Sequence, residues 1–328
     1  MAIRVVTEAE LRELVHLDEE SLQAVAEGFS ALATTEVALP PIMRIDVLDQ
    51  NGEVDVKSAY VRGAERFAIK IAGGFWENPK RYNLPSGSGQ MVVLSATTGR
   101  CEAILLDNGY LTDVRTALAG ALAARHLARQ SLQTVGQIGA GAQGRYQMQA
   151  LQLVRRYERV LVYDRDEARL KSYASEMPDV LGVEVVVASS AEEVIRGSDC
   201  ATTSTPSHEP FLRAEWLHEG LHVTAMGADA EHKQELFPEV LGRADLVVCD
   251  RKSQCVRLGE LHHAVNAGLA ADDDQVRELG ELTAGKHPGR DSEAQITVAD
   301  LTGVGVQDTA ISLLAYTKAQ EAGAGVQV

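Results

Sequence analysis

The sequence predicts a two-domain α/β protein, in which a doubly wound parallel sheet follows an N-terminal region of α+β type. With 328 residues the chain is too long for one comfortable hydrophobic core. From about residue 134, short and nearly continuous apolar runs alternate with helical segments, as in a parallel sheet covered on both faces. Before that, from about residue 39 to 107, β-rich runs joined by turn signals indicate a mostly antiparallel sheet.

The composition excludes several classes of partner. A formal net charge of −16 argues against nucleic acid and against anionic lipid surfaces, which both attract basic proteins. No apolar run approaches the ~20 residues that span a bilayer, and no basic segment followed by an apolar stretch opens the chain. We therefore expect a cytoplasmic protein without nucleic-acid or membrane partners.

The four cysteines give no sign of a disulfide framework or a metal site. They lack the paired spacing of zinc ligands, and Cys200 and Cys249 sit in apolar runs, which predicts buried core thiols. The cysteines are Cys101, Cys200, Cys249 and Cys255.

The N-terminal region begins with helices. Thr7 and Glu10 form a T-x-x-E capping box for a short first helix. Apolar residues at helical spacing predict a second helix, namely Leu22, Val25, Ala26, Phe29 and Leu32. Strands are expected at residues 54–61, 66–75, 91–96 and 101–107, with Gly99 supplying the turn of the last hairpin.

An alanine-rich helix, predicted to be capped by Thr112 and to run to about Ala128, connects this region to the parallel sheet. Buried strands are expected at residues 134–140, 159–164, 183–188, 200–206, 221–227 and 246–250, and a last strand at 295–299. A final helix from Val306 to about Gln320 is expected to return to the first domain.

The segment Gly139-Ala140-Gly141-Ala142-Gln143-Gly144 matches G-x-G-x-x-G between a β-run and a helix expected from about Gly144 to Arg155. In a Rossmann-type fold the first glycine makes the tight turn, the second admits a pyrophosphate, and the third lets helix and strand pack closely. Ala142 and Gln143 lie where free helix N–H groups meet the phosphates. The alternative is a structural strand–helix turn that binds no dinucleotide.

Asp164 ends the next predicted strand, 20 residues after Gly144. A carboxylate there accepts hydrogen bonds from both ribose hydroxyls of NAD(H) and repels the 2′-phosphate of NADP. Arg165 follows it and could hold such a phosphate, so NADP stays an alternative.

With these residues in hand, the chain resembles the ornithine cyclodeaminase/mu-crystallin family over nearly its full length. The resemblance rests on motifs in the family's order: Arg44 after a Pro-Pro pair, AIKI with Lys70, LTDVRTALAGALAARHLA with Arg115, QIGAGAQG, MGAD with Asp229, KQEL, LGEL and LTGVGVQD. GEVDVKSAY and LLDNGYLTDVRTA look most like the ectoine-utilisation protein C subgroup, and GGFWENPKRYNLP looks like the iminosuccinate reductases.

The resemblance implies a substrate-binding and dimerisation domain at residues 1–115, joined by the C-terminal helix at 306–328, and an NAD-binding Rossmann domain at 116–305. It implies a homodimer and hydride transfer between an α-amino acid and its α-imine. Three hypotheses follow: an NADH-dependent imine reductase or amino-acid dehydrogenase, a cyclodeaminase that uses NAD catalytically, or a crystallin-like binding protein without activity.

By the resemblance, Arg44 and Arg115 clamp the substrate carboxylate, Lys70 binds the carboxylate or a developing oxygen, and Asp229 is the general acid/base. The alternatives without a catalytic role are a structural Arg44, a Lys70 on a solvated strand face and an Asp229 that only forms a turn.

Weaker cofactor candidates follow two strands of the parallel sheet. They are Ser204, Thr205, Met226 and Gly227, together with Pro206 and Glu260. His262 and His263 are expected on a helix surface, and no metal is needed because the nicotinamide carries the redox step.

The substrate side chain is open at this stage. The loop from Gly73 to Asn83 contains Lys80 and Arg81, which favours a second carboxylate, as in iminosuccinate. The alternative is a solvated loop in which both cations point away from the site. The ectoine-like resemblance favours an imine derived from diaminobutyrate instead.

Overall fold

The computed structural model describes residues 2–269 and 275–328, and the chain forms two compact units. The first unit is Met1–Arg115 with Val304–Val328, and the second is Thr116–Gly303. Within the described residues, no helix has both the length and the apolar character needed to cross a bilayer.

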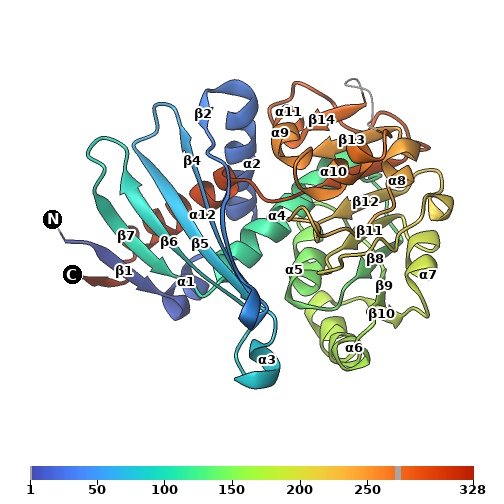
Figure 1. Ribbon diagram of the computed structural model, residues 1–328, viewed down its shortest axis with the longest axis horizontal. Coiled ribbons are helices and arrows are strands. Elements are labelled where there is room, and N and C mark those ends of the chain that lie inside the picture. The colour runs from blue at the N-terminus through green and yellow to red at the C-terminus, as the bar shows by residue number, and fades with distance from the viewer. Residues whose placement is uncertain (1, 270–274) are drawn as a thin grey trace. The chain divides into compact units, whose positions relative to one another are not determined.

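The first unit holds one sheet and the helices packed on it (Figure 1). Its elements are β1 (Arg4–Thr7), α1 (Glu8–Leu14), α2 (Glu19–Thr34), β2 (Val37–Ala38), β3 (Met43–Val47), η1 (Leu48–Gln50), β4 (Gly52–Val61), β5 (Arg66–Phe75), α3 (Asn78–Arg81), β6 (Gly87–Ser95), β7 (Cys101–Leu106), α12 (Gly305–Glu321) and β16 (Val326–Gln327). Helix α4 (Tyr110–Leu127) begins here and continues into the second unit.

The sheet of the first unit has the order β16-β1-β7-β6-β5-β4-β2, with β3 also paired to β4. Strands β3 to β7 pair antiparallel with their neighbours in sequence, in agreement with the mostly antiparallel sheet that was expected. Gly99 has a φ of 69° in the β6–β7 turn, a conformation that glycine adopts without strain. Helix α12 packs on β4, β5 and α2, and its buried face includes Ile311, Ala315 and Ala319.

The first turn of α12 lies directly against the sheet. A Cβ atom at Gly305 would stand 2.3 Å from the carbonyl oxygen of Ser58, so only glycine allows this approach. One turn further, the Thr309 hydroxyl donates to the carbonyl of Ala59 at 2.9 Å and accepts the N–H of Ala68 at 3.3 Å. These contacts fix the start of α12 across β4 and β5.

The second unit is a doubly wound sheet, and the pairings between its described strands are parallel (Figure 1). The strand order is β10-β9-β8-β11-β12-β15-β13-β14. The elements are β8 (Thr134–Ile138), α5 (Ala142–Leu151), β9 (Arg159–Tyr163), α6 (Glu167–Leu181), β10 (Glu184–Val187), α7 (Ala191–Arg196), β11 (Cys200–Thr203), η2 (Ala214–Trp216), β12 (His222–Ala225), α8 (Glu239–Arg243), β13 (Leu246–Cys249), α9 (Lys252–Cys255), α10 (Gly259–Asn266), β14 (Val276–Glu278), α11 (Leu279–Thr283) and β15 (Thr297–Asp300).

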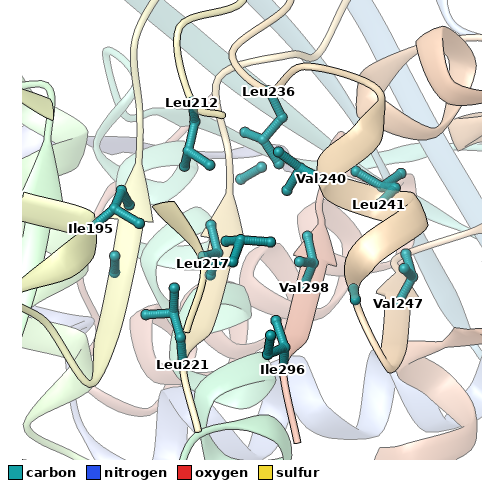
Figure 2. Packing of buried hydrophobic residues seen from close by; sticks show 14 of the residues in the cluster. Ile195, Leu212, Leu217, Leu221, Leu236, Val240, Leu241, Val247, Ile296 and Val298 are labelled. Carbon is teal, nitrogen blue, oxygen red and sulfur yellow. The ribbon is translucent and has the colours of Figure 1, made fainter. Parts of the chain in front are cut away.

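Both faces of this sheet are buried, since successive residues of a strand belong to different clusters. Val160 and Val162 of β9 belong to one hydrophobic cluster and Leu161 to the other. The larger cluster joins β12, β13 and β15 to α7 and α8, and Figure 2 shows Ile195, Val240, Val298 and their neighbours in it. The order of strands reverses between β8 and β11, the point where open α/β sheets bind ligands. The predicted fold class, a Rossmann-type parallel sheet plus an N-terminal α+β region, is confirmed.

Several predicted boundaries were wrong. Helix α4 begins at Tyr110, so Thr112 is not its cap; the Asp107 carboxylate instead accepts the N–H of Leu111 at 2.9 Å. Helix α5 begins at Ala142, earlier than expected, and ends at Leu151 rather than Arg155. The short strands β1, β2, β3, β14 and β16 were missed.

Replacing Gly305 with alanine is expected to destabilise the first unit by about 1–3 kcal/mol, because the added methyl group collides with the backbone of β4. Urea unfolding followed by circular dichroism measures the change. Gly87→Ala is the matched control in the same unit, because a Cβ there meets no atom within 4 Å. Equal midpoints for the two variants would show that the approach of α12 is not tight.

Candidate functional site

The glycine turn after β8 has the geometry expected of a dinucleotide-binding loop. Gly139 has a φ of 100°, and a Cβ there would lie 2.7 Å from the carbonyl of Ser204. A Cβ at Gly144 would lie 2.2 Å from the carbonyl of Gly139, so this glycine lets α5 approach the turn. A Cβ at Gly141 meets nothing within 4 Å, so the middle of the turn is open. Ala142 and Gln143 open α5, where helical N–H groups lack intrahelical acceptors.

Asp164 follows β9 beside this turn. One oxygen of its carboxylate accepts the N–H of Ala140 at 2.7 Å, and the other accepts the N–H of Asp166 at 2.8 Å. Arg165 is exposed. The sequence-predicted acidic residue therefore lies at the strand tip next to the glycine turn.

A buried carboxylate ties together the ends of β11 and β12. Glu235 is fully buried and accepts hydrogen bonds from the hydroxyls of Thr203 and Thr205 and from the N–H groups of Thr205 and Gly227, at 2.7–2.8 Å. A Cβ at Gly227 would lie 2.2 Å from the carbonyl of Thr205, so the two loops are in close contact. Ser204 accepts a hydrogen bond from the Gln137 side chain at 2.9 Å. Ser204, Thr205, Met226 and Gly227 thus gather around the carboxyl ends of β8, β11 and β12.

Glu260 lies beneath these loops rather than in them. It is 1% exposed, and its carboxylate accepts the backbone N–H groups of Glu235 and Leu236. The N–H of Glu260 in turn donates to the buried carboxylate of Asp300 at 3.1 Å. Burial raises the pKa of Glu235, Glu260 and Asp300, that of Asp300 to about 7. The expectation that Glu260 lines a cofactor cleft was wrong, because both of its oxygens are used by backbone groups.

Asp229 follows β12 two residues after Gly227 and is partly exposed. Its Oδ1 accepts a hydrogen bond from Lys233 Nζ at 2.7 Å, and Lys233 is 4% exposed. His263 Nε2 lies 2.9 Å from the carbonyl of Lys233 and anchors this segment, while the His263 side chain stays partly exposed on α10. The pair places a carboxylate with a fixed cationic neighbour at the carboxyl end of a parallel strand.

Lys70 is the most unusual side chain of the first unit. It is 2% exposed, whereas its neighbours Ile69 and Ile71 on the other face of β5 are only partly buried. The solvated-face interpretation of Lys70 was therefore wrong. Burial, reinforced by the charge of Arg115, lowers the pKa of Lys70 to about 7 although Asp308 opposes this shift.

Asp308, in the first turn of α12, joins Lys70 to Arg115. Its Oδ1 lies 3.0 Å from Lys70 Nζ and 2.9 Å from Arg115 Nε, and the carboxylate is fully buried. Gln307 Oε1 accepts a hydrogen bond from Arg115 Nη1 at 2.8 Å. Burial alone would raise the pKa of Asp308, but Arg115, Lys70 and Lys57 outweigh it and hold the pKa below its usual value. We call Lys70, Arg115 and Asp308 the buried ion cluster.

Lys57 adds a further cation to this face of the sheet. It is the cross-strand partner of Lys70 in the β4–β5 pair and is 6% exposed. Asp107, before α4, is fully buried, and burial raises the pKa of its carboxyl to about 6. Among the described residues around Lys70, three buried cations thus accompany two buried carboxyl groups, which favours an anionic ligand.

Arg44 does not join the buried ion cluster through any contact within the described residues. Its guanidinium binds Glu53 and Asp46, the latter at 2.9 Å, and lies 3.8 Å from Asp55. The register explains this, because Arg44 and Asp46 of β3 pair with Asp55 and Glu53 of β4. A ligand carboxylate at Arg44 would have to replace one of these partners.

Glu235, Asp300, Asp308 and Lys57 were not predicted as site residues from the sequence. A charged residue in an amphipathic pattern ordinarily indicates the solvated face. The available signals were that Glu235, Asp308 and Lys57 lie in motifs that carry the family resemblance, and that Asp308 sits between core-type residues of the final helix.

The model of the ornithine cyclodeaminase/mu-crystallin family matches residues 2–323 of this chain. A putative dehydrogenase of Rhizobium meliloti (strain 1021) is 50% identical over 323 residues, which are 98% of each chain. Among solved structures, the Δ1-pyrroline-2-carboxylate reductase of Thermococcus litoralis with NADH and L-proline superposes with a TM-score of 0.93, at 29% identity over 99% of this chain and 100% of that one.

The iminosuccinate reductase of Paracoccus denitrificans in complex with NAD⁺ superposes with a TM-score of 0.90, at 31% identity over 100% of this chain and 99% of that chain. These likenesses extend over both units. The chain belongs to the ornithine cyclodeaminase/mu-crystallin family.

Proposed function

We propose that this protein is an NAD(H)-dependent oxidoreductase that interconverts an α-imino acid and its α-amino acid. The observation that carries the proposal is the buried ion cluster, in which two cations share one carboxylate. An ordinary structural ion pair needs no excess cation, because a buried uncompensated charge is costly. A substrate carboxylate would complete the balance, and similar proteins act on imino acids or bind an amino acid.

The residues of the glycine turn fit a dinucleotide. The open position at Gly141 leaves room for a pyrophosphate, and the first N–H groups of α5, at Ala142 and Gln143, would donate to it. Asp164 would exchange its backbone partners for the ribose hydroxyls and disfavour NADP, while Arg165 is the residue that a 2′-phosphate would need. NADH, when bound, supplies the hydride that reduces the imine carbon.

The side chains of the chain itself bind the substrate and move its proton. Lys70 and Arg115 hold the α-carboxylate, which fixes the orientation of the neighbouring imine carbon. Asp229 gives a proton to the imine nitrogen in reduction and takes it back in oxidation. Arg44 is a second carboxylate ligand only if its acidic partners yield to the substrate.

Two features bear on the substrate side chain. Lys80 and Arg81 are exposed in α3. That helix follows Phe75, and Phe75 lies about 17 Å from Lys70 along the strand. Lys80 and Arg81 therefore do not support a dicarboxylate substrate. The buried Lys57, which pairs with Lys70 across the strands, does support one. Glu53 and Asp55 on the same face favour a cationic group instead.

A substrate panel tests the proposal. The panel contains α-keto acids, pyruvate and oxaloacetate first, each with ammonia or methylamine. It also contains the diamino acids ornithine and 2,4-diaminobutyrate. The assay measures the consumption of NADH and the release of ammonia. We expect one NADH to be consumed per keto acid, with a higher catalytic efficiency for NADH than for NADPH. The variant Asp229→Asn should lose ~10²–10⁴-fold in turnover while it still binds NADH. Asp179→Asn, an exposed change on α6, is the control.

Ammonia released from a diamino acid without net change in NADH would instead identify a cyclodeaminase. NADH binding without turnover of any compound would favour the crystallin-like alternative.

Carboxylate binding is expected to weaken as the pH rises through about 7. The protonated ammonium of Lys70 is the form that binds an anion, and burial lowers its pKa to about 7, so the charge is lost above that pH. Pyruvate binding to the NADH complex without amine measures the effect. Lys70→Arg stays protonated at all these pH values and should remove the decline. A decline that persists unchanged in Lys70→Arg contradicts the role of Lys70.

A further inference from the structure

The buried ion cluster depends on a carboxylate that lies between its two cations. Asp308 is fully buried, and the oxygen facing Lys70 and Arg115 contacts both of them. We propose that Asp308 is a positioning residue, which holds Lys70 and Arg115 together so that both reach one anionic group of the substrate. This inference rests on the proposed function, because the anionic group is taken to be the substrate's carboxylate.

The two cations of the cluster lie close to each other. Lys70 Nζ and Arg115 Nε lie 3.0 and 2.9 Å from the same oxygen, so they are no more than 5.9 Å apart. Two cations at such a distance in a buried site repel each other strongly. They remain neighbours on β5 and α4 because the carboxylate between them neutralises part of their charge. Without it, Arg115 stays charged and Lys70 gives up its proton.

The fold fixes Asp308 independently of its ion pairs. Gly305 and Thr309, on either side of it in sequence, lock the first turn of α12 onto β4 and β5. The carboxylate also lies at the helix N-terminus, where the helix dipole favours negative charge. Gln307 holds a second nitrogen of Arg115, so the guanidinium is oriented from two adjacent residues of one helical turn. The start of α12 therefore acts as a rigid support for both cations.

The charge state of Lys70 reports this arrangement. The charged and titratable groups that face it are Lys57 from β4, Arg115 from α4, Asp308 from α12 and Asp107 before α4. Burial, Arg115 and Lys57 lower its pKa, and Asp308 raises it. Removing the charge of Asp308 must therefore move the titration of Lys70 to lower pH, whether or not a substrate is known.

The experiment titrates Lys70 by NMR in the full-length protein labelled with ¹³C at the lysine Cε, its signal being assigned with Lys70→Arg. The wild-type midpoint is expected near 7. Asp308→Asn, which keeps the shape of the side chain, should lower the midpoint of the Lys70 titration by at least one pH unit. It should also reduce kcat/KM on the panel's best substrate by ~10²-fold, mainly through a higher KM. Glu321→Gln removes an exposed charge from the other end of α12 and should change neither quantity.

Asp308→Glu keeps the charge but moves it by one methylene, so the Lys70 midpoint should stay near 7 while KM rises. This variant decides the question if Asp308→Asn does not fold. A Lys70 midpoint unchanged in Asp308→Asn, or a wild-type KM in Asp308→Glu, overturns the inference. Absence of turnover in the wild-type protein contradicts the proposed function but not this inference. The titration of Lys70 then still decides whether Asp308 holds the two cations together.

Discussion

The close approach of Lys70 and Arg115 in the first unit depends on the partial neutralisation of their charges by Asp308. Removing one partner of a buried ion pair costs about 3–5 kcal/mol, because the other charge is left uncompensated. The pair here comes from distant parts of the chain, Lys70 from a hairpin and Asp308 from the C-terminal helix. The close approach at Gly305 and the hydrogen bonds of Thr309 are what bring α12 to the sheet at the right register. A cationic site can therefore persist inside the unit before any ligand arrives.

The second unit uses buried acids for a different purpose. Glu235, Glu260 and Asp300 form a chain in which each carboxylate accepts backbone N–H groups from the next segment. Such bonds satisfy N–H groups that loops at strand ends would otherwise leave unpaired in the interior. Their consequence is that the loops after β11 and β12, which include Ser204 and Gly227, have fixed positions. Buried carboxyl groups thus support the loops of one unit and balance cations in the other.

The sequence was sufficient to predict features that follow local rules. The glycine motif predicted its turn, since Gly139 has a φ of 100° and Gly144 is required by the nearby carbonyl of Gly139. Buried strands were recognised because short, nearly continuous apolar runs are typical of a parallel sheet that is covered on both faces. Lys70 was different: alternation placed it opposite the isoleucines, but only the family resemblance suggested that its side was the buried one.

What the sequence could not provide depends on register and distant contacts. The acidic partners of Arg44 follow from the pairing of β3 with β4, and β3 itself was not recognised. Asp107 replaced Thr112 as the capping residue of α4, because the chain turns at Gly109, which has a φ of 91°. Asp308 and Glu235 were missed since a carboxylate in a helix or loop ordinarily points to water, and their partners lie 238 and 32 residues away along the chain.

The most direct test of the account is a crystal structure of the protein with NADH and a small α-keto acid such as pyruvate. The account predicts that the carboxylate lies within hydrogen-bonding distance of Lys70 Nζ and the Arg115 guanidinium, with Asp308 still bonded to both. A carboxylate bound elsewhere, with no anion at the buried ion cluster, would contradict the central claim that this cluster is the substrate's anion site.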